Sequence, residues 1–325
     1  MDNLETNLNE LKDILNLSKK QIEDRKLSLI DFSKNGFPSK KDEDWKFIDL
    51  NRIISSKIPK IKFSNNLVSK KIENKEIFNN ISKNLLENNY VISKNGLITD
   101  VVLDHEDKNK FSITKIPANI KEDQYSSLSS LNKAFYLDYL KIVIKENYKF
   151  KKPVLIINYS SPEIENTVLN QRFDLIMEKN SCMSILDLNW NLSKNNFYNI
   201  NNNFQLNENS ILKNYKIDLN NNSNIFYSKT KIELYKNSIS ENFIISSGSE
   251  CSKNEIECDL KEKFSSAFVN GIINLEVSKQ HEIRSKINHL SENTKSYQLV
   301  KCALKDKSKA VYQGKIFVDN VAQKT

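Results

Sequence analysis

The sequence predicts a mainly β protein, in which a β-solenoid follows a small helical and mixed N-terminal region. From residue 139 onward, segments rich in β-branched and aromatic residues begin about every 14 residues. The turn words EKNS, NENS and YKNS recur at 178–181, 207–210 and 235–238, so Asn209 follows Asn180 by 29 residues and precedes Asn237 by 28. A fixed period of this size is typical of repeat architectures.

A solenoid with two strands and about 28 residues per coil explains this period best. An up-and-down barrel or a sandwich is the alternative, but hairpin turns favour Asn-Gly or Asp-Gly. The repeat region has no Asp-Gly, and its one Asn-Gly, Asn270-Gly271, lies inside an expected strand. Asn at a coil corner tolerates a left-handed backbone without glycine. One face of each strand then lines the interior, with candidate interior sets Phe173, Leu175 and Met177, or Ile211, Asn214 and Ile217.

The chain is expected to divide into an N-terminal helical and mixed region, 1–138, and a β-helix core, 139–325. Residues 3–35 are predicted to be helical, because apolar residues recur there at spacings of three, four or seven, and to end near Gly36. A further helix is expected over 76–88, and short strands over 90–93 and 97–103. The expected core strands are 139–146, 152–160, 172–178, 182–190, 197–206, 211–219, 224–234, 239–246, 253–260, 267–277, 281–290, 295–304 and 310–318.

Composition excludes several classes of function. The mean hydropathy is −0.56 and no apolar run is long enough to span a bilayer, so we expect no membrane segment. The N-terminus lacks the apolar stretch of a signal peptide, which favours a cytoplasmic protein. The formal net charge is +8, but Lys is mixed with Glu and Asp along the chain, so a nucleic-acid partner is not favoured. Only five glycines occur and no phosphate-binding loop motif is present, which argues against nucleotide binding.

Cysteine and histidine give no sequence signature of a metal site. The four cysteines are Cys182, Cys251, Cys258 and Cys302. None forms a C-x-x-C pair, so a zinc knuckle or a thioredoxin-type site is not indicated, and reduced, buried thiols are the more frequent outcome. His289 at the end of an expected strand is the best candidate for a proton-handling or ligand group, but a structural histidine held by hydrogen bonds is more frequent. His281 and His105 are weaker candidates.

Several words of the sequence, taken together, resemble the SufB/SufD family of iron–sulfur cluster assembly scaffolds. The C-terminal words are HLSENTKSYQLVKCAL at 289–304, AVYQGKIFV at 310–318 and AQKT at 322–325. EDWKFIDL at 43–50, LNKAFYLDYLKIVI at 131–144 and KPVLI at 152–156 follow the family's order, and VISKNG at 91–96 matches loosely. The N-terminal word favours the SufD branch. The family positions fall on His289, Ser296, Gln298, Lys301, Gly314, Gln323, Lys324 and Thr325.

The resemblance implies a right-handed parallel β-helix after an N-terminal helical region, and a role as a non-catalytic scaffold. It implies a SufB-like subunit and a SufC-like ATPase as partners, with no cofactor bound tightly by this chain and an Fe–S cluster present transiently in the complex. The family continues beyond its Gln-Lys-Thr word through further strands, a functional His and the helices that dock SufC. Those words are absent here, so the sequence is expected to be a C-terminally incomplete copy, with Val311, Tyr312, Ile316 and Val318 in an uncovered last coil.

The other site hypotheses are weaker. Thiolates suit Fe–S clusters, which makes Cys258 and Cys302 candidates, although no spacing supports a cluster site. Trp45 is more often a core anchor than a binding platform. The alternative function is a carbohydrate-active β-helix enzyme, which requires two carboxylates about 5–10 Å apart along one groove. Glu255 and Glu257 share a strand face and are expected to pair with Glu282 on the next coil.

Overall fold

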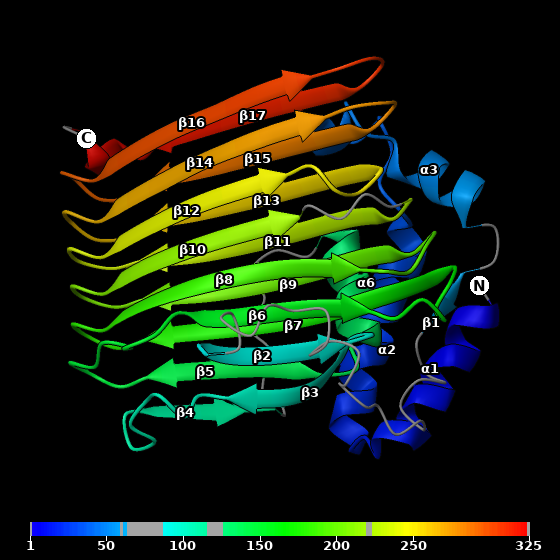
Figure 1. Ribbon diagram of the computed structural model, residues 1–325, viewed down its shortest axis with the longest axis horizontal. Coiled ribbons are helices and arrows are strands. Elements are labelled where there is room, and N and C mark those ends of the chain that lie inside the picture. Colours follow the sequence, from blue (N-terminus) through cyan, green and yellow to red (C-terminus); the bar gives the residue numbers. More distant parts are fainter. Residues whose placement is uncertain (1, 59–60, 64–86, 116–125, 219–222, 324–325) are drawn as a thin grey trace.

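The computed structural model of the protein describes residues 2–58, 61–63, 87–115, 126–218 and 223–323. It is a parallel β-solenoid with helices at one side (Figure 1). Among these residues the strands form two sheets. The first sheet has the order β17-β15-β13-β11-β9-β7-β5-β4, with β1 beside β7, and the second has the order β16-β14-β12-β10-β8-β6-β2-β3. Consecutive strands alternate between the sheets from β5 onward, which confirms the predicted two-strand coil.

The strand bounds agree closely with the periodic segments of the sequence. The first sheet contains β1 (Lys62–Phe63), β4 (Phe111–Thr114), β5 (Tyr139–Ile144), β7 (Thr167–Met177), β9 (Phe197–Leu206), β11 (Ile225–Leu234), β13 (Cys251–Leu260), β15 (Gln280–His289) and β17 (Lys309–Val318). The second contains β2 (Asn89–Lys94), β3 (Leu97–Val102), β6 (Val154–Ser160), β8 (Cys182–Asn191), β10 (Ile211–Asp218), β12 (Ile239–Ser246), β14 (Ser266–Leu275) and β16 (Lys295–Leu304). Every described pair from β5 to β17 is parallel.

Asparagine holds the coil corners in the left-handed conformation, as the repeating turn words predicted. Asn180, Asn209 and Asn237 have φ of 58°, 59° and 56°. Their side chains also stack from coil to coil, because Asn209 Nδ2 donates to Asn180 Oδ1 at 2.8 Å and Asn237 Nδ2 donates to Asn209 Oδ1 at 3.0 Å. At the same position of the following coil stands Phe264, with φ of 64° and an exposed ring. A bulky residue rarely adopts this conformation, so this corner is strained.

The predicted N-terminal helix is divided in two. Helix α1 (Asp2–Leu15) ends before a turn, and α2 (Lys19–Asn35) begins after Ser18. Ser18 and Gln21 form a capping box, which satisfies backbone donors that a continuous helix would use internally. The Ser-x-x-Gln word was therefore the signal for the break. Helix α2 ends at Gly36, at φ 67°, as expected. No helix in the described part of the chain is long and apolar enough to cross a membrane.

The helices pack on the outer face of the first sheet (Figure 1). They are α1, α2, the short η1 (Glu43–Trp45), α3 (Leu50–Lys57) and α6 (Ser127–Phe135). Arg25 of α2, 3 % exposed, donates to the carbonyl groups of Ala134 and Tyr136 at the end of α6. Asn132 of α6 donates to the carbonyl groups of Gln171 and Asn199 on the sheet. These bonds fix α6 over β7 and β9.

The region before residue 139 also contributes to both sheets. Strands β2 and β3 agree with the predicted segments 90–93 and 97–103, and they form an antiparallel hairpin through Asn95 and Gly96, both at positive φ. Strand β2 pairs in parallel with β6, so it extends the second sheet. Most of the helix predicted over 76–88, its residues 76–86, lies outside the described residues. Strand β2 begins directly after the predicted segment, at Asn89.

Apolar side chains fill most of the space between the sheets. Phe173, Leu175 and Met177 line this interior, as predicted. The prediction for β10 was confirmed for Asn214 but wrong for Ile211 and Ile217, which belong to the half-buried outer side. The interior side of β10 carries Leu212, Asn214, Lys216 and Asp218. Sequence reasoning placed the isoleucines inside, whereas the buried pairing partners of Lys216 and Asp218 determine the phase of the strand.

Candidate functional site

The described family-motif positions lie on the last two coils. His289 ends β15, Ser296, Gln298 and Lys301 lie on β16, and Gly314 lies on β17. Lys324 and Thr325 are outside the described residues. Four of these positions, His289, Ser296, Gln298 and Gly314, contribute to two polar clusters between the sheets.

His289 is held at both ring nitrogens. Its Nδ1 lies 2.7 Å from Thr294 Oγ1, and its Nε2 lies 3.0 Å from Ser296 Oγ. Thr294 donates its hydroxyl hydrogen to the Ser291 carbonyl, so it accepts from His289 Nδ1–H. The neutral ring therefore accepts the Ser296 hydroxyl hydrogen at Nε2. Burial lowers the pKa of His289 below its ordinary value, which favours this neutral form.

Gln298 forms the second cluster. Its Oε1 accepts hydrogen bonds from the hydroxyl groups of Ser285 and Tyr312, which are 3.0 Å from each other. Gly314 lies beside Ser285 in the register of β15 and β17. A Cβ at position 314 would lie 3.0 Å from both Gln298 Oε1 and the Tyr312 hydroxyl oxygen. A larger residue at position 314 would therefore push the ends of the Gln298 and Tyr312 side chains away by a few tenths of an ångström, and glycine avoids this.

The remaining candidates are not brought into these clusters. Lys301 is exposed on the outer face of the second sheet, and Gln323 is exposed after the 3-10 helix η3 (Asn320–Ala322). Cys258 is fully buried in the apolar interior, whereas Cys302 is exposed on β16. Burial raises the pKa of both thiols, which disfavours the thiolate form that binds iron.

The other two cysteines are also not placed as metal ligands would be. Cys251 is buried and Cys182 half-buried, and all four thiols are free. Burial raises the pKa of Cys251 to about 12. Within the described ranges, no three His, Cys, Asp or Glu side chains are grouped as a metal site would require.

Sequence reasoning missed Ser285, Thr294 and Tyr312 as members of the clusters. Ser285 shares a face of β15 with Ile283 and Ile287, and Tyr312 shares a face of β17 with Ile316. This alternation was the signal in the sequence that could have placed both residues on the interior side. Tyr312, Ile316 and Val318 are exposed by 38 %, 58 % and 47 %. Val311 is half-buried, and the alternation places it on the opposite face.

A second polar line crosses the interior at the middle coils. Lys216 of β10 lies 3.5 Å from the carboxylate of Asp187 of β8 and donates to Ser228 across the interior. Burial lowers the pKa of Lys216 and raises that of Asp187. Asp218 accepts from the backbone and side chain of Ser249, and burial raises the pKa of Asp218 to about 6. These contacts join buried polar groups of neighbouring coils in the interior.

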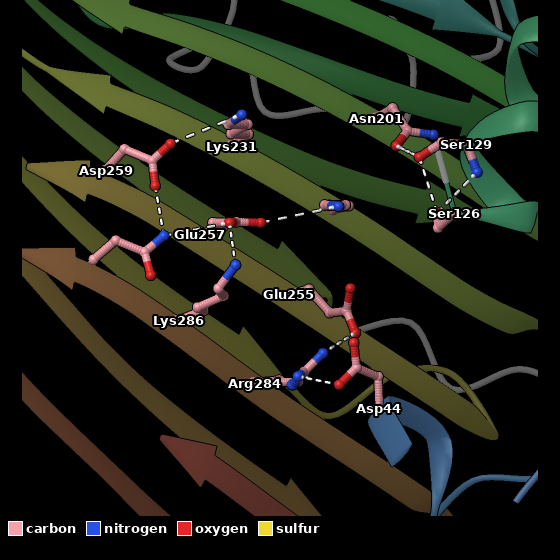
Figure 2. A network of polar contacts seen from close by, with 12 residues as sticks. Asp44, Ser126, Ser129, Asn201, Lys231, Glu255, Glu257, Asp259, Arg284 and Lys286 are labelled. Carbon is pink, nitrogen blue, oxygen red and sulfur yellow. Dashed lines mark hydrogen bonds and ion pairs between the residues drawn. The ribbon is translucent and has the colours of Figure 1, made fainter. Parts of the chain in front are cut away.

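A groove of about 1030 Å³ runs along the outer face of the first sheet beside α6. Figure 2 shows its charged side chains, which come from neighbouring strands and form ion pairs across the sheet. Glu257 of β13 accepts from Lys286 of β15 at 2.7 Å and lies 4.0 Å from Lys229. Burial alone would raise the pKa of Glu257, but the hydrogen bond from Lys286 and the charge of Lys229 hold it below its ordinary value. Glu257 is therefore an ionised member of an ion-pair ladder.

Glu282 does not share the groove with Glu255 and Glu257 as expected. Its side chain is fully buried and accepts from Lys253 at 2.5 Å. The Lys253 ammonium group also donates to the Asp44 carbonyl at 2.6 Å and lies 4.6 Å from the centroid of the Trp45 ring. Trp45 is 7 % exposed, so it is a core anchor that fixes η1 to the sheet. Glu255 lies 3.5 Å from Arg284, which also pairs with Asp44.

Comparison with known protein families gives a match over most of the solenoid. A family model described as "SUF system FeS cluster assembly, SufBD core domain" matches residues 159–325, from the end of β6 through the last coil. This range is 167 of the 325 residues and contains all the C-terminal motif positions. A search of curated proteins finds no match.

Proposed function

We propose that this chain is a SufD-like, non-catalytic scaffold subunit. The proposal starts from its family, because the chain belongs to the SufBD core-domain family of the SUF iron–sulfur cluster assembly system. In this proposal it acts in the cytoplasm together with a SufB-like subunit and a SufC-like ATPase. The iron–sulfur cluster is the cargo of the complex, and it is built only transiently in contact with this chain. The observation that carries the proposal is the family match over the coils that contain the motif residues.

The geometry of the motif residues supports a scaffold more than an enzyme. Both ring nitrogens of His289 are used in hydrogen bonds to Thr294 and Ser296. A general base needs a free lone pair within reach of the proton that it removes. Gln298 is likewise bonded to two hydroxyl groups. These side chains hold the last coils in one arrangement, which suits a subunit that presents a rigid surface.

Co-purification tests the proposal. The chain is co-expressed with the SufB-like and SufC-like proteins of the same organism, and a tag on the chain is used to recover the complex. We expect the SufB-like subunit to be recovered and its cluster content after reconstitution to fall when the chain is omitted. Recovery of neither partner would overturn the complex. A stable cluster reconstituted on the isolated chain would instead indicate a SufB-like role.

The carbohydrate-active alternative is separated by one assay. It requires a free acid and a free base along the groove. Glu257 is paired with two lysines and Glu282 is buried, which disfavours this chemistry. Hydrolysis of a polysaccharide panel by the pure chain, lost in Glu257→Gln, would support the alternative and contradict the scaffold proposal.

A further inference from the structure

The groove beside α6 has more positive charge than its own carboxylates neutralise. Seven Lys or Arg and four Asp or Glu side chains line it, which leaves an excess of three positive charges. Each carboxylate already has a partner. Asp174 accepts from Tyr139 at 2.6 Å, Glu233 from Lys261 at 2.5 Å, and Asp259 from Asn288 at 2.6 Å, while Glu257 is bonded to Lys286 as described above.

Two of the cations, Lys141 of β5 and Lys315 of β17, form no ion pair within the described part of the chain, although the charge of Lys315 helps to lower the pKa of Asp44. They stand at the two ends of one register row. Following the parallel pairs from β5 to β17, this row passes through Asp174, Asn203, Lys231, Glu257 and Lys286. The row crosses six strand spacings of about 4.8 Å, so the two ammonium groups are about 29 Å apart.

We infer that this groove binds an extended, acidic segment of a partner protein, with one carboxylate at Lys141 and another at Lys315. An extended chain advances about 3.3 Å per residue and its side chains alternate between two faces, so two acidic residues with seven residues between them point the same way and span about 26 Å, close to this spacing. Asn203 and Gln205 of β9 also line the groove, and because their amide nitrogens donate to Asp174 and Asn207, their amide oxygens are the groups offered to a peptide.

The charges between the two lysines favour a peptide over other anions. A single small anion reaches only one of two groups that are about 29 Å apart. A nucleic acid carries charge continuously, about one per 1.7 Å of duplex axis, and its phosphates would meet the carboxylates of Asp174 and Glu257 in the middle of the row. A peptide can be neutral there and charged at its two ends. This inference does not depend on the role of the chain in cluster assembly.

Fluorescence anisotropy with labelled peptides tests the inference on the full chain. The test peptide has Glu at its first and ninth positions, which lie on one face of an extended chain, and neutral polar residues between them. A second peptide of the same composition has both Glu residues at its centre, and a third has Lys in place of Glu. We expect the first to bind, the second to bind several-fold more weakly and the third not to bind.

Variants of the protein make the test specific. Lys141→Gln and Lys315→Gln should each weaken binding of the first peptide by up to about fivefold, the range of a solvent-accessible ion pair. Lys307→Gln, at an exposed turn of the same coil as Lys315, is the matched control and should have no such effect. The double variant Lys141→Glu/Lys315→Glu should gain affinity for the Lys peptide, with an unchanged circular dichroism spectrum.

Three outcomes would overturn the inference: equal binding of the first two peptides, an equal loss of affinity in Lys307→Gln, or no gain of affinity for the Lys peptide in the double variant. Tighter binding of a single-stranded oligonucleotide than of the first peptide would also overturn it, since it would assign the groove to nucleic acid.

Discussion

Replacing His281 by Gln should remove a large part of the acid sensitivity of the fold. His281 lies in the solenoid interior at 0 % exposure. Its Nε2 is 2.6 Å from the Ser249 carbonyl oxygen, which can only accept, so Nε2 carries the hydrogen. Its Nδ1 is 2.8 Å from Ser246 Oγ and accepts the hydroxyl hydrogen. Both positions thus fit the neutral ring, and burial lowers the pKa of His281 from 6.5 to about 4.

The sign of the effect follows from linkage. The folded state binds fewer protons than the unfolded state between pH 4 and pH 6.5, so the free energy of unfolding falls as the pH falls through this window. The full shift of about 2.5 units corresponds to about 3 kcal/mol, of which about 2 kcal/mol is lost between pH 7 and pH 5. Asp218 acts in the opposite direction, because its pKa is raised to about 6 and its protonation favours the folded state in the same window.

Comparing the wild type with His281→Gln separates the contribution of His281 to the pH dependence of stability from that of Asp218, which both proteins contain. Urea unfolding of the wild type and of His281→Gln is measured at pH 7, 6, 5 and 4.5. We expect the wild type to lose about 2 kcal/mol more than the variant between pH 7 and pH 5. His105→Gln, at an exposed turn, removes an imidazole without this burial and should retain the wild-type profile. Parallel profiles of the wild type and His281→Gln would refute the reasoning.

Substitutions at two corners and at the N-terminal anchor are tested by thermal and urea unfolding. Asn209→Gly keeps the left-handed corner but loses the two ladder hydrogen bonds, so it should lower the free energy of unfolding by about 1–2 kcal/mol. Asn209→Ala should lower it by about 1 kcal/mol more, because Ala resists positive φ. Equal losses in the two variants would exclude strain at this corner. Phe264→Asn restores the corner residue of the other coils and should stabilise the protein by about 1 kcal/mol, and a lower unfolding midpoint would contradict this. Lys253→Met leaves the Glu282 carboxylate buried without its ammonium partner and should lower the free energy of unfolding by about 3–5 kcal/mol. Adding Glu282→Leu should recover most of this loss. If it does not, the contact between Lys253 and Trp45 dominates the stabilisation.

The sequence allowed the strands and corners to be predicted because they repeat. A period of 28 or 29 residues returns Asn to the same corner, and the described strand ends fall within a few residues of the expected ones. The break between α1 and α2 was also present in the sequence, as the capping box of Ser18 and Gln21. It was overlooked because the apolar spacing continues across it from Leu15 to Ile22.

The phase of β10 could not be predicted from hydrophobicity. Alternation suggested that Ile211 and Ile217 face inward, yet Lys216 and Asp218 do. Their burial depends on partners from other coils, Asp187 of β8 for Lys216 and Ser249, which precedes β13, for Asp218. A buried charge is tolerated only when such partners are in place. The information that decides the phase is therefore distributed over 31 residues on either side, from Asp187 to Asp218 and from Asp218 to Ser249.

The family motif itself reflects the geometry of one coil. Ser285 and Gln298 are 13 residues apart, and Gln298 and Tyr312 are 14 apart, about half of a coil in each case, so each pair meets across the interior. Gly314 lies next to Ser285 in register, and its missing Cβ leaves room for the cluster. The spacing of these residues is thus required by packing, whatever the coil is used for. The family match covers these coils, whereas functional surfaces must be sought among more accessible side chains, such as the half-buried Lys141 and the exposed Lys315, which form no ion pair within the described part of the chain.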